Sequence, residues 1–296
     1  MTVSLSTYKQ RLRLFILLSF GLSATATVLR LLSLLFFYDS DMAYYTVGAP
    51  LPIISNIFYA ISAIFFIVAA FFLIKPENDE IPAPNQAVKY AALIPCAALA
   101  VHALFILLDI VKIISEFGAI ALRYILKGEV IGGVNRLDIL LLVFAIFSAI
   151  FFANIAFAKQ HSLLTVISGT GVALWIGMSW VGSYMDFFVP MNSPDKLLFH
   201  FACIGAALLL VGELRAIYGI PNAKTYYFSL SCAILTLSVS AIPSIIGDFA
   251  NSFRIYSTEY ENIVFFALLI YAAVRGFSLM PKKEPSEQTT TEETQE

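Results

Sequence analysis

The sequence predicts an all-α polytopic integral membrane protein with eight transmembrane helices, and three observations lead to this prediction. Hydrophobic residues make up 59% of the chain and charged residues only 13%, about half the charged share of soluble domains. The apolar residues gather in runs of about 20, the length at which a helix crosses a hydrocarbon core about 30 Å thick. The runs lack the alternation of barrel strands, so each is expected to satisfy its backbone hydrogen bonds as a helix.

Eight such runs follow one another along the chain. They are Leu14–Phe37, Leu51–Ile74, Tyr90–Val111, Ile139–Ala158, Leu163–Gly182, Leu197–Tyr218, Tyr226–Ile246 and Ile263–Met280. An amphipathic segment, residues 112–136, separates the third run from the fourth. We expect the third helix to end near Glu116 and a short interfacial helix to follow Gly118, because glycine favours a break. Residues 281–296 contain too few apolar side chains to fold and are expected to form a disordered cytoplasmic tail.

A weak internal repeat divides the apolar part of the chain into two. A Pro-Asn pair precedes the third and the seventh run, and a Cys-Ala pair follows inside each, at Cys96 and Cys232. The pattern predicts two parallel four-helix halves, residues 1–161 and 162–280, related by an axis along the membrane normal. Chance similarity between two apolar segments is the alternative explanation.

Small residues and prolines predict where the helices pack and bend. Gly169, Ala173 and Gly177 recur every four residues, a spacing that lets another helix approach closely. We expect this stripe to form the contact between the halves. Pro95 and Pro243 are expected to kink the third and seventh spans, because proline removes a backbone donor inside a helix.

Lysines and arginines predict the orientation. Most of them flank the spans on the side that holds the N-terminus, and positive residues stay preferentially on the cytoplasmic side. An even number of spans then places both termini in the cytoplasm. Short loops and the absence of an Asn-x-Ser/Thr sequon favour the bacterial cytoplasmic membrane.

His102 is the first candidate site residue. It lies 12 residues after Tyr90, about 18 Å into the hydrocarbon, so its imidazole is expected near the midplane. Asp109 follows seven residues later, about 340° around the helix and therefore on the same face. An ionisable side chain at this depth suggests a proton relay or a ligand contact. A hydrogen bond that only joins two helices is the structural alternative.

Arg30 and Glu213 lie nearer the membrane boundaries. We expect Arg30 to extend its guanidinium outward to the interface or to pair with an outer aspartate. The aspartates within reach are Asp39, Asp41 and Asp109. We expect Glu213 to form a solvated pair with its neighbour Arg215.

Several acidic residues and one histidine fall at the outer ends of the predicted helices. They are Asp109, Asp186, Asp195, Asp248 and His200. Together they would form an acidic outer vestibule that attracts cations. The alternative is that they are scattered, solvated side chains without a site. Asp248 and His200 are kept as ligand or proton candidates.

One short motif has a known counterpart. The residues Gly177-Met178-Ser179-Trp180-Val181-Gly182 resemble the serine motif of rhomboid intramembrane proteases, and His200 lies at a similar depth on the next helix. The resemblance implies a serine nucleophile with a histidine base. Trp180 departs from it, because that family has a small residue there, and the His/Asn helix pattern of the family is not found.

The sequence lacks the metal-binding, phosphate-binding and nucleic-acid-binding patterns of many protein classes. Cys96, Cys203 and Cys232 are isolated, so no zinc ligand set is expected, and no glycine loop for a phosphate or other cofactor occurs. A net charge of −2 leaves no basic surface for nucleic acid. The sequence therefore favours a permease-like or small-ligand-binding membrane protein with its site between the two halves, taking a small molecule or an ion. The alternatives are a non-catalytic subunit or sensor that pairs with another membrane protein, and an intramembrane serine hydrolase.

Overall fold

A computed structural model describes most of the chain. The described residues are 5–39, 42, 44–74, 80–157, 163–185, 190, 193–250 and 259–281. Within these ranges, eight helices are long and apolar enough to cross a membrane, so the predicted all-α polytopic fold is confirmed and the chain is a multi-pass membrane protein surrounded by lipid. The predicted tail from residue 282 onward lies outside the described residues.

Helices make up almost all of the described residues, and short loops join most of them. In chain order the elements are α1 (Leu5–Phe37), β1 (Tyr38–Asp39), β2 (Tyr44–Tyr45), α2 (Pro50–Val68), the π-helical turn η1 (Ala69–Leu73), α3 (Gln86–Phe117), α4 (Ile120–Lys127), α5 (Arg136–Phe157), α6 (Leu163–Met185), α7 (Pro194–Ile217), α8 (Ala223–Ala250) and α9 (Glu259–Ser278). The two short strands pair antiparallel, with Tyr38 opposite Tyr45.

The ends of α3 follow from two residues. Asn85 begins the helix, because its side-chain oxygen accepts a hydrogen bond from the Val88 backbone N–H at 3.0 Å. Gly118 ends it with φ at 75°, a left-handed conformation that favours glycine. The predicted break at this glycine is confirmed, and α4 follows it. Ala121 and Ile125 of α4 are buried with Ile113 of α3.

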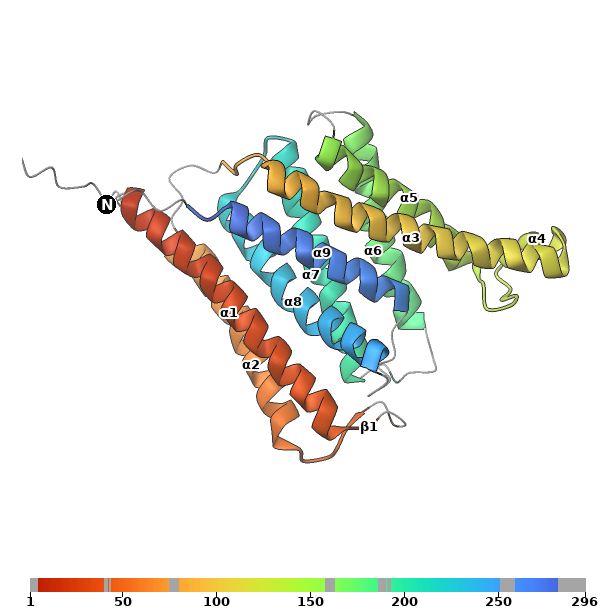
Figure 1. The fold of residues 1–296 in the computed structure, drawn as a ribbon, viewed down its shortest axis with the longest axis horizontal. Coiled ribbons are helices and arrows are strands. Elements are labelled where there is room, and N and C mark those ends of the chain that lie inside the picture. Colours follow the sequence, from red (N-terminus) through yellow and green to blue (C-terminus); the bar gives the residue numbers. More distant parts are fainter. Residues whose placement is uncertain are drawn as a thin grey trace, which may run out of the picture.

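α8 lies at the centre of the bundle. It packs against α1, α7 and α9, while α3 packs against α5 and α9, and α6 lies between α5 and α7. Figure 1 shows the α1–α2 pair and the α3–α5 pair on opposite sides of α8 and α9. Helices from both predicted halves are thus in direct contact. The division into two related halves stays a prediction.

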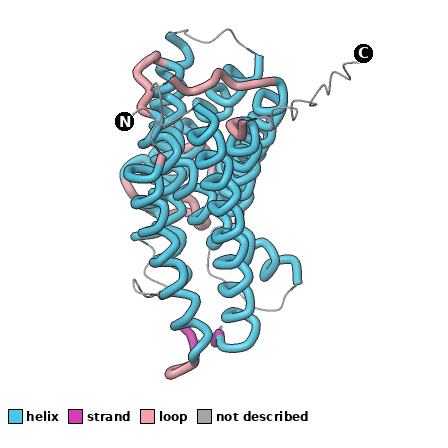
Figure 2. The backbone as a smooth tube through the Cα atoms, turned by 90° about the vertical axis from the view of Figure 1, so that its left-hand side faces the viewer, coloured by secondary structure: helices cyan, strands magenta, loops and turns pink. Residues whose placement is uncertain are grey.

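The helices run lengthwise between two ends of the molecule. Figure 2 shows β1 and β2 at one of these ends. We call this the strand end. Figure 1 shows that α1 begins and α9 ends at the opposite end, which we call the terminal end. α3 ends and α9 begins toward the strand end, so this is the end at which the candidate site lies.

The predicted small-residue stripe on α6 is wrong. Gly169 lies in a close contact, but Ala173 is exposed and Gly177 faces open space. An equally close approach occurs at Gly171, outside the stripe, where an added Cβ would overlap the Phe147 side chain of α5. The three residues do not form a single contact because α6 packs against α5 on one face and against α7 on another.

Candidate functional site

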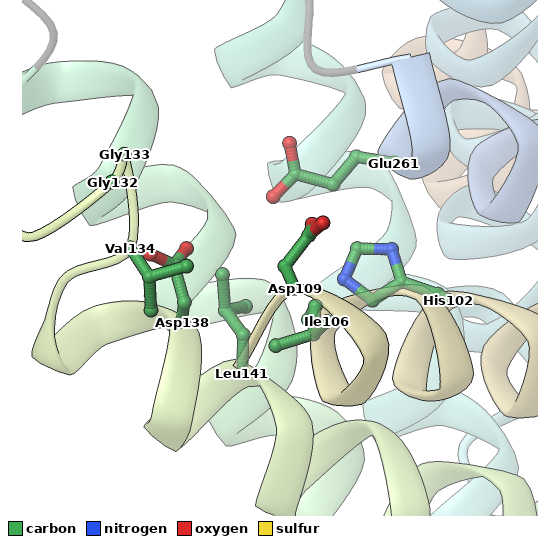
Figure 3. Close-up of a pocket in the computed structure, with 9 residues that line it drawn as sticks. All are labelled: His102, Ile106, Asp109, Gly132, Gly133, Val134, Asp138, Leu141 and Glu261. Atoms are coloured by element: carbon green, nitrogen blue, oxygen red, sulfur yellow. The ribbon is translucent and has the colours of Figure 1, made fainter. Parts of the chain in front are cut away.

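A pocket of about 300 Å³ lies between α3, α5 and α9, toward the strand end. It is lined by His102, Ile106, Asp109, Gly132, Gly133, Val134, Asp138, Leu141 and Glu261. Figure 3 shows these side chains around the opening between the three helices. Four of the nine are ionisable, and they come from helices on both sides of the predicted division of the chain.

α3 contributes His102 and Asp109. Figure 3 shows both side chains on one face of the helix, directed toward Glu261, as the seven-residue spacing predicts. His102 is 5% exposed, and its ring packs edge-on against Trp175 of α6, with the ring centroids 5.7 Å apart. Asp109 lies two turns nearer the strand end and is exposed. The pair therefore extends from the buried wall of the pocket to its surface.

α5 contributes Asp138 from its first turn. The Asn135 backbone N–H donates to the Asp138 Oδ2 at 2.8 Å, and the Leu137 N–H donates to the Asn135 Oδ1 at 2.7 Å. A carboxylate is favoured at this position because the N-terminal end of a helix carries partial positive charge. Sequence reasoning missed Asp138, although Asn135 followed three residues later by an acid is a recognisable helix-start signal.

α9 contributes Glu261, the most buried acid of the pocket. Its side chain is 4% exposed, and Figure 3 shows its carboxylate directed into the opening near Asp109. Ser179 of α6 lies next to this carboxylate, although no hydrogen bond of ordinary geometry joins them. Sequence reasoning missed Glu261 because it precedes the predicted span by two residues, where an acid is usually solvated.

Arg30 forms a separate buried cluster. Its Nη2 donates to the Asp195 Oδ1 of α7, and the Tyr38 hydroxyl donates to the Asp195 Oδ2. Both charged side chains are buried. The expected extension of Arg30 to the interface is therefore wrong, because the packing of α1 supplies a partner inside the protein. Asp195 in turn is no part of a solvated vestibule.

Tyr38 completes this cluster just beyond the end of α1. Burial and the neighbouring Asp195 carboxylate raise the pKa of the Tyr38 phenol above its usual range. The phenol is neutral at physiological pH, as tyrosines generally are, and its hydroxyl donates a hydrogen bond to Asp195. The Arg30 guanidinium also faces the Tyr45 ring, 5.2 Å from its centroid, which adds a cation–π contact.

A second paired cluster lies toward the terminal end. The Arg275 Nε donates to the Glu213 Oε1 at 3.1 Å and to the Tyr226 hydroxyl at 2.7 Å. Its Nη2 donates to the Pro82 carbonyl at 2.9 Å. The expected solvated pair of Glu213 with Arg215 is wrong, since Glu213 is buried and its partner is Arg275. This cluster ties α7, α8 and α9 to the segment before α3.

The serine motif does not assemble into a nucleophile and base in this structure. The Ser179 hydroxyl makes no hydrogen bond within the described residues, so none joins it to His200. His200 instead lies beside Trp180, with ring centroids 6.0 Å apart. It is half-buried on α7 and does not line the pocket. Trp180, the residue that departs from the rhomboid motif, is therefore the one that lies beside His200.

Asp248 lies in the last turn of α8, and its side chain falls outside the described residues. Within the described ranges, no group of three or more histidine, cysteine, aspartate or glutamate side chains is arranged to hold a metal ion. The pocket acids therefore surround a space and do not converge on one point.

The pocket can accept hydrogen bonds and balance positive charge, and His102 can exchange a proton. Its apolar wall is formed by Ile106, Val134 and Leu141. A small polar ligand is the kind of molecule that such a lining can hold. No protein-family model matches the chain, and comparisons with curated proteins and with solved structures found no match.

Proposed function

We propose that the chain is a permease-like membrane protein that binds a small polar ligand in the pocket formed by α3, α5 and α9. His102, Asp109, Asp138 and Glu261 are its polar contacts. α3 and α5 belong to the first predicted half and α9 to the second. A ligand held between the halves of a transporter is released when they move relative to each other.

One observation carries this proposal: the charges of the pocket are not neutralised by the protein as the other buried charges are. Arg30 is paired with Asp195, and Glu213 with Arg275. In the part of the chain that the structure describes, no lysine or arginine lines the pocket or forms an ion pair with its three acids. Polar groups that only join helices are expected to satisfy one another. Asp138 caps the start of α5, but neither Asp109 nor Glu261 has an ion-pair partner among the described residues.

The test is a comparison of thermal unfolding between wild type and His102→Leu in lipid nanodiscs. We expect at least one compound from a panel of ions, amines, amino acids, sugars and lipids to raise the midpoint Tm of wild type. A ligand stabilises the state that binds it. The same compound is expected to shift Tm of His102→Leu less, because His102 forms a wall of the pocket. The panel should be measured between about pH 5 and pH 8, where a histidine titrates.

The result also decides between the two main functions. Equal responses of wild type and His102→Leu to every compound would contradict the ligand site and favour a non-catalytic subunit or sensor. His200→Leu is the matched control, because His200 is also on a spanning helix and lies outside the pocket. Its response to the panel should equal that of wild type.

We also infer the membrane and the orientation. Short loops favour the bacterial cytoplasmic membrane, and the distribution of lysines and arginines places both termini in the cytoplasm. The pocket lies toward the end opposite to the one at which α1 begins and α9 ends. In this orientation it faces the exterior, where a permease would collect its ligand.

A further inference from the structure

We infer that the ligand of this pocket is a small organic cation, an alkylammonium or quaternary amine, with Glu261 as its buried counter-charge. This inference rests on the proposed function and adds the chemical class of the ligand. It follows from the sign of the charges in the pocket, the burial of Glu261 and the size and apolar wall of the cavity.

The ionisable lining is mainly acidic. Asp109, Asp138 and Glu261 are acids, and His102 is the fourth ionisable group. Such a concentration of one charge in a cavity with low-dielectric walls attracts the opposite charge. An anionic ligand would meet three carboxylates, and no lysine or arginine faces them among the described residues. A cation is therefore the charge class that the pocket favours.

Glu261 is the second, independent sign of a ligand. It is 4% exposed and directed into the cavity. In the described part of the chain it forms no ion pair, and its neighbour Ser179 is a neutral hydroxyl that supplies no counter-charge. A buried carboxylate without a counter-charge is costly. A cation in the cavity would supply the counter-charge that Asp195 and Glu213 already receive from arginines.

The cavity favours an organic cation over a bare metal ion. Its volume is about 300 Å³, far more than the roughly 10–15 Å³ that a single water molecule requires. The described acids are not arranged as a metal ligand set. Ile106, Val134 and Leu141 form an apolar wall beside them. A positive charge that carries methyl or methylene groups matches both the acidic and the apolar surface.

The experiment uses choline and its neutral carbon isostere, 3,3-dimethylbutan-1-ol, called dimethylbutanol below. These two probes have nearly the same shape and differ in the positive charge. Tm of the full-length protein in nanodiscs is measured against the concentration of each probe, for wild type, Glu261→Gln and Asp109→Asn. Tetramethylammonium and methylammonium extend the series to smaller cations. Glu129→Gln is the matched control, because Glu129 is an exposed acid of the α4–α5 connection outside the pocket.

We expect a saturable rise in Tm of wild type with at least one organic cation and none with dimethylbutanol. Glu261→Gln should weaken the apparent affinity about tenfold or more, because it removes a buried counter-charge. Glu129→Gln should respond as wild type. Asp109 is exposed, so Asp109→Asn is expected to fold normally and to weaken binding by a smaller factor. This variant keeps the test informative if Glu261→Gln does not fold.

Other outcomes would overturn the inference in distinguishable ways. If dimethylbutanol or a neutral compound of the first panel stabilises wild type through His102 and no organic cation does, the ligand class is wrong while the proposed function stands. Stabilisation by sodium or calcium ions alone, lost in Glu261→Gln, would replace the organic cation by a metal ion. If neither this series nor the first panel shifts Tm, both the class and the ligand-binding function fail.

Discussion

The charged side chains inside this membrane protein differ in how their charge is balanced. Arg30 and Asp195 neutralise each other although 165 residues separate them, and Arg275 and Glu213 do the same at the terminal end. Glu261 has no such partner among the described residues. Loss of a buried ion pair is expected to lower stability, whereas the buried acid beside the pocket is where we propose that a ligand binds.

The Arg30–Asp195 pair gives a prediction about stability. Arg30→Met is expected to lower the free energy of unfolding by about 3–5 kcal/mol, because it leaves the Asp195 carboxylate buried without its cation. The double variant Arg30→Met/Asp195→Asn should recover a large part of that loss. Unfolding in mixed micelles, driven by increasing detergent, measures both changes.

Arg123→Met is the control for the Arg30 and Asp195 variants. Arg123 is an exposed cation on α4, so its loss should change the free energy of unfolding by less than about 1 kcal/mol. A drop as large as that of Arg30→Met would show that the assay responds to total charge and would contradict the pairing. Failure of the double variant to recover stability would do the same.

At the scale of the helices, glycines decide how closely the spanning elements approach. α7 and α8 meet at Gly205, where an added Cβ would overlap Thr236 and lie 3.2 Å from the Ala233 Cα. Close approach at small residues is a main source of helix association in lipid, because apolar side chains gain little by leaving a hydrocarbon solvent. The stripe that the sequence suggested on α6 does not serve this contact.

Alanine substitutions at Gly205 and Gly177 are expected to change stability in different ways. Gly205→Ala is expected to destabilise the protein by about 1–3 kcal/mol, because a backbone atom of α8 cannot move aside as a side chain can. Gly177→Ala should be neutral or stabilising by up to about 1 kcal/mol, because Gly177 faces open space and alanine is the better helix former. Unfolding in mixed micelles compares the two. Equal losses would contradict the α7–α8 contact.

At the scale of the whole molecule, the even number of spans places the start of α1 and the end of α9 at the same end. The lysine and arginine distribution predicts that this end is cytoplasmic, and the pocket lies toward the other end. Ligand entry from outside therefore depends on an orientation that charge alone predicts.

A C-terminal fusion tests this orientation. Green fluorescent protein attached after Glu296 is expected to fluoresce in bacterial cells, and alkaline phosphatase at the same position is expected to stay inactive. The two reporters respond to opposite sides of the membrane, so each controls for poor expression of the other. An active phosphatase with a dark fluorescent fusion would place the pocket toward the cytoplasm.

The sequence by itself determined the number of spans, the break at Gly118 and the shared face of His102 and Asp109. These features depend on run length, on glycine and on a constant turn of 100° per residue, which act within one segment. The tertiary structure decided that Asp138 and Glu261 join His102, and that Arg30 and Glu213 have partners on other helices. Hydropathy does not contain this information, because side chains that face lipid and side chains that face another helix are equally apolar. Which charge is paired and which faces a cavity therefore depends on which helices pack together.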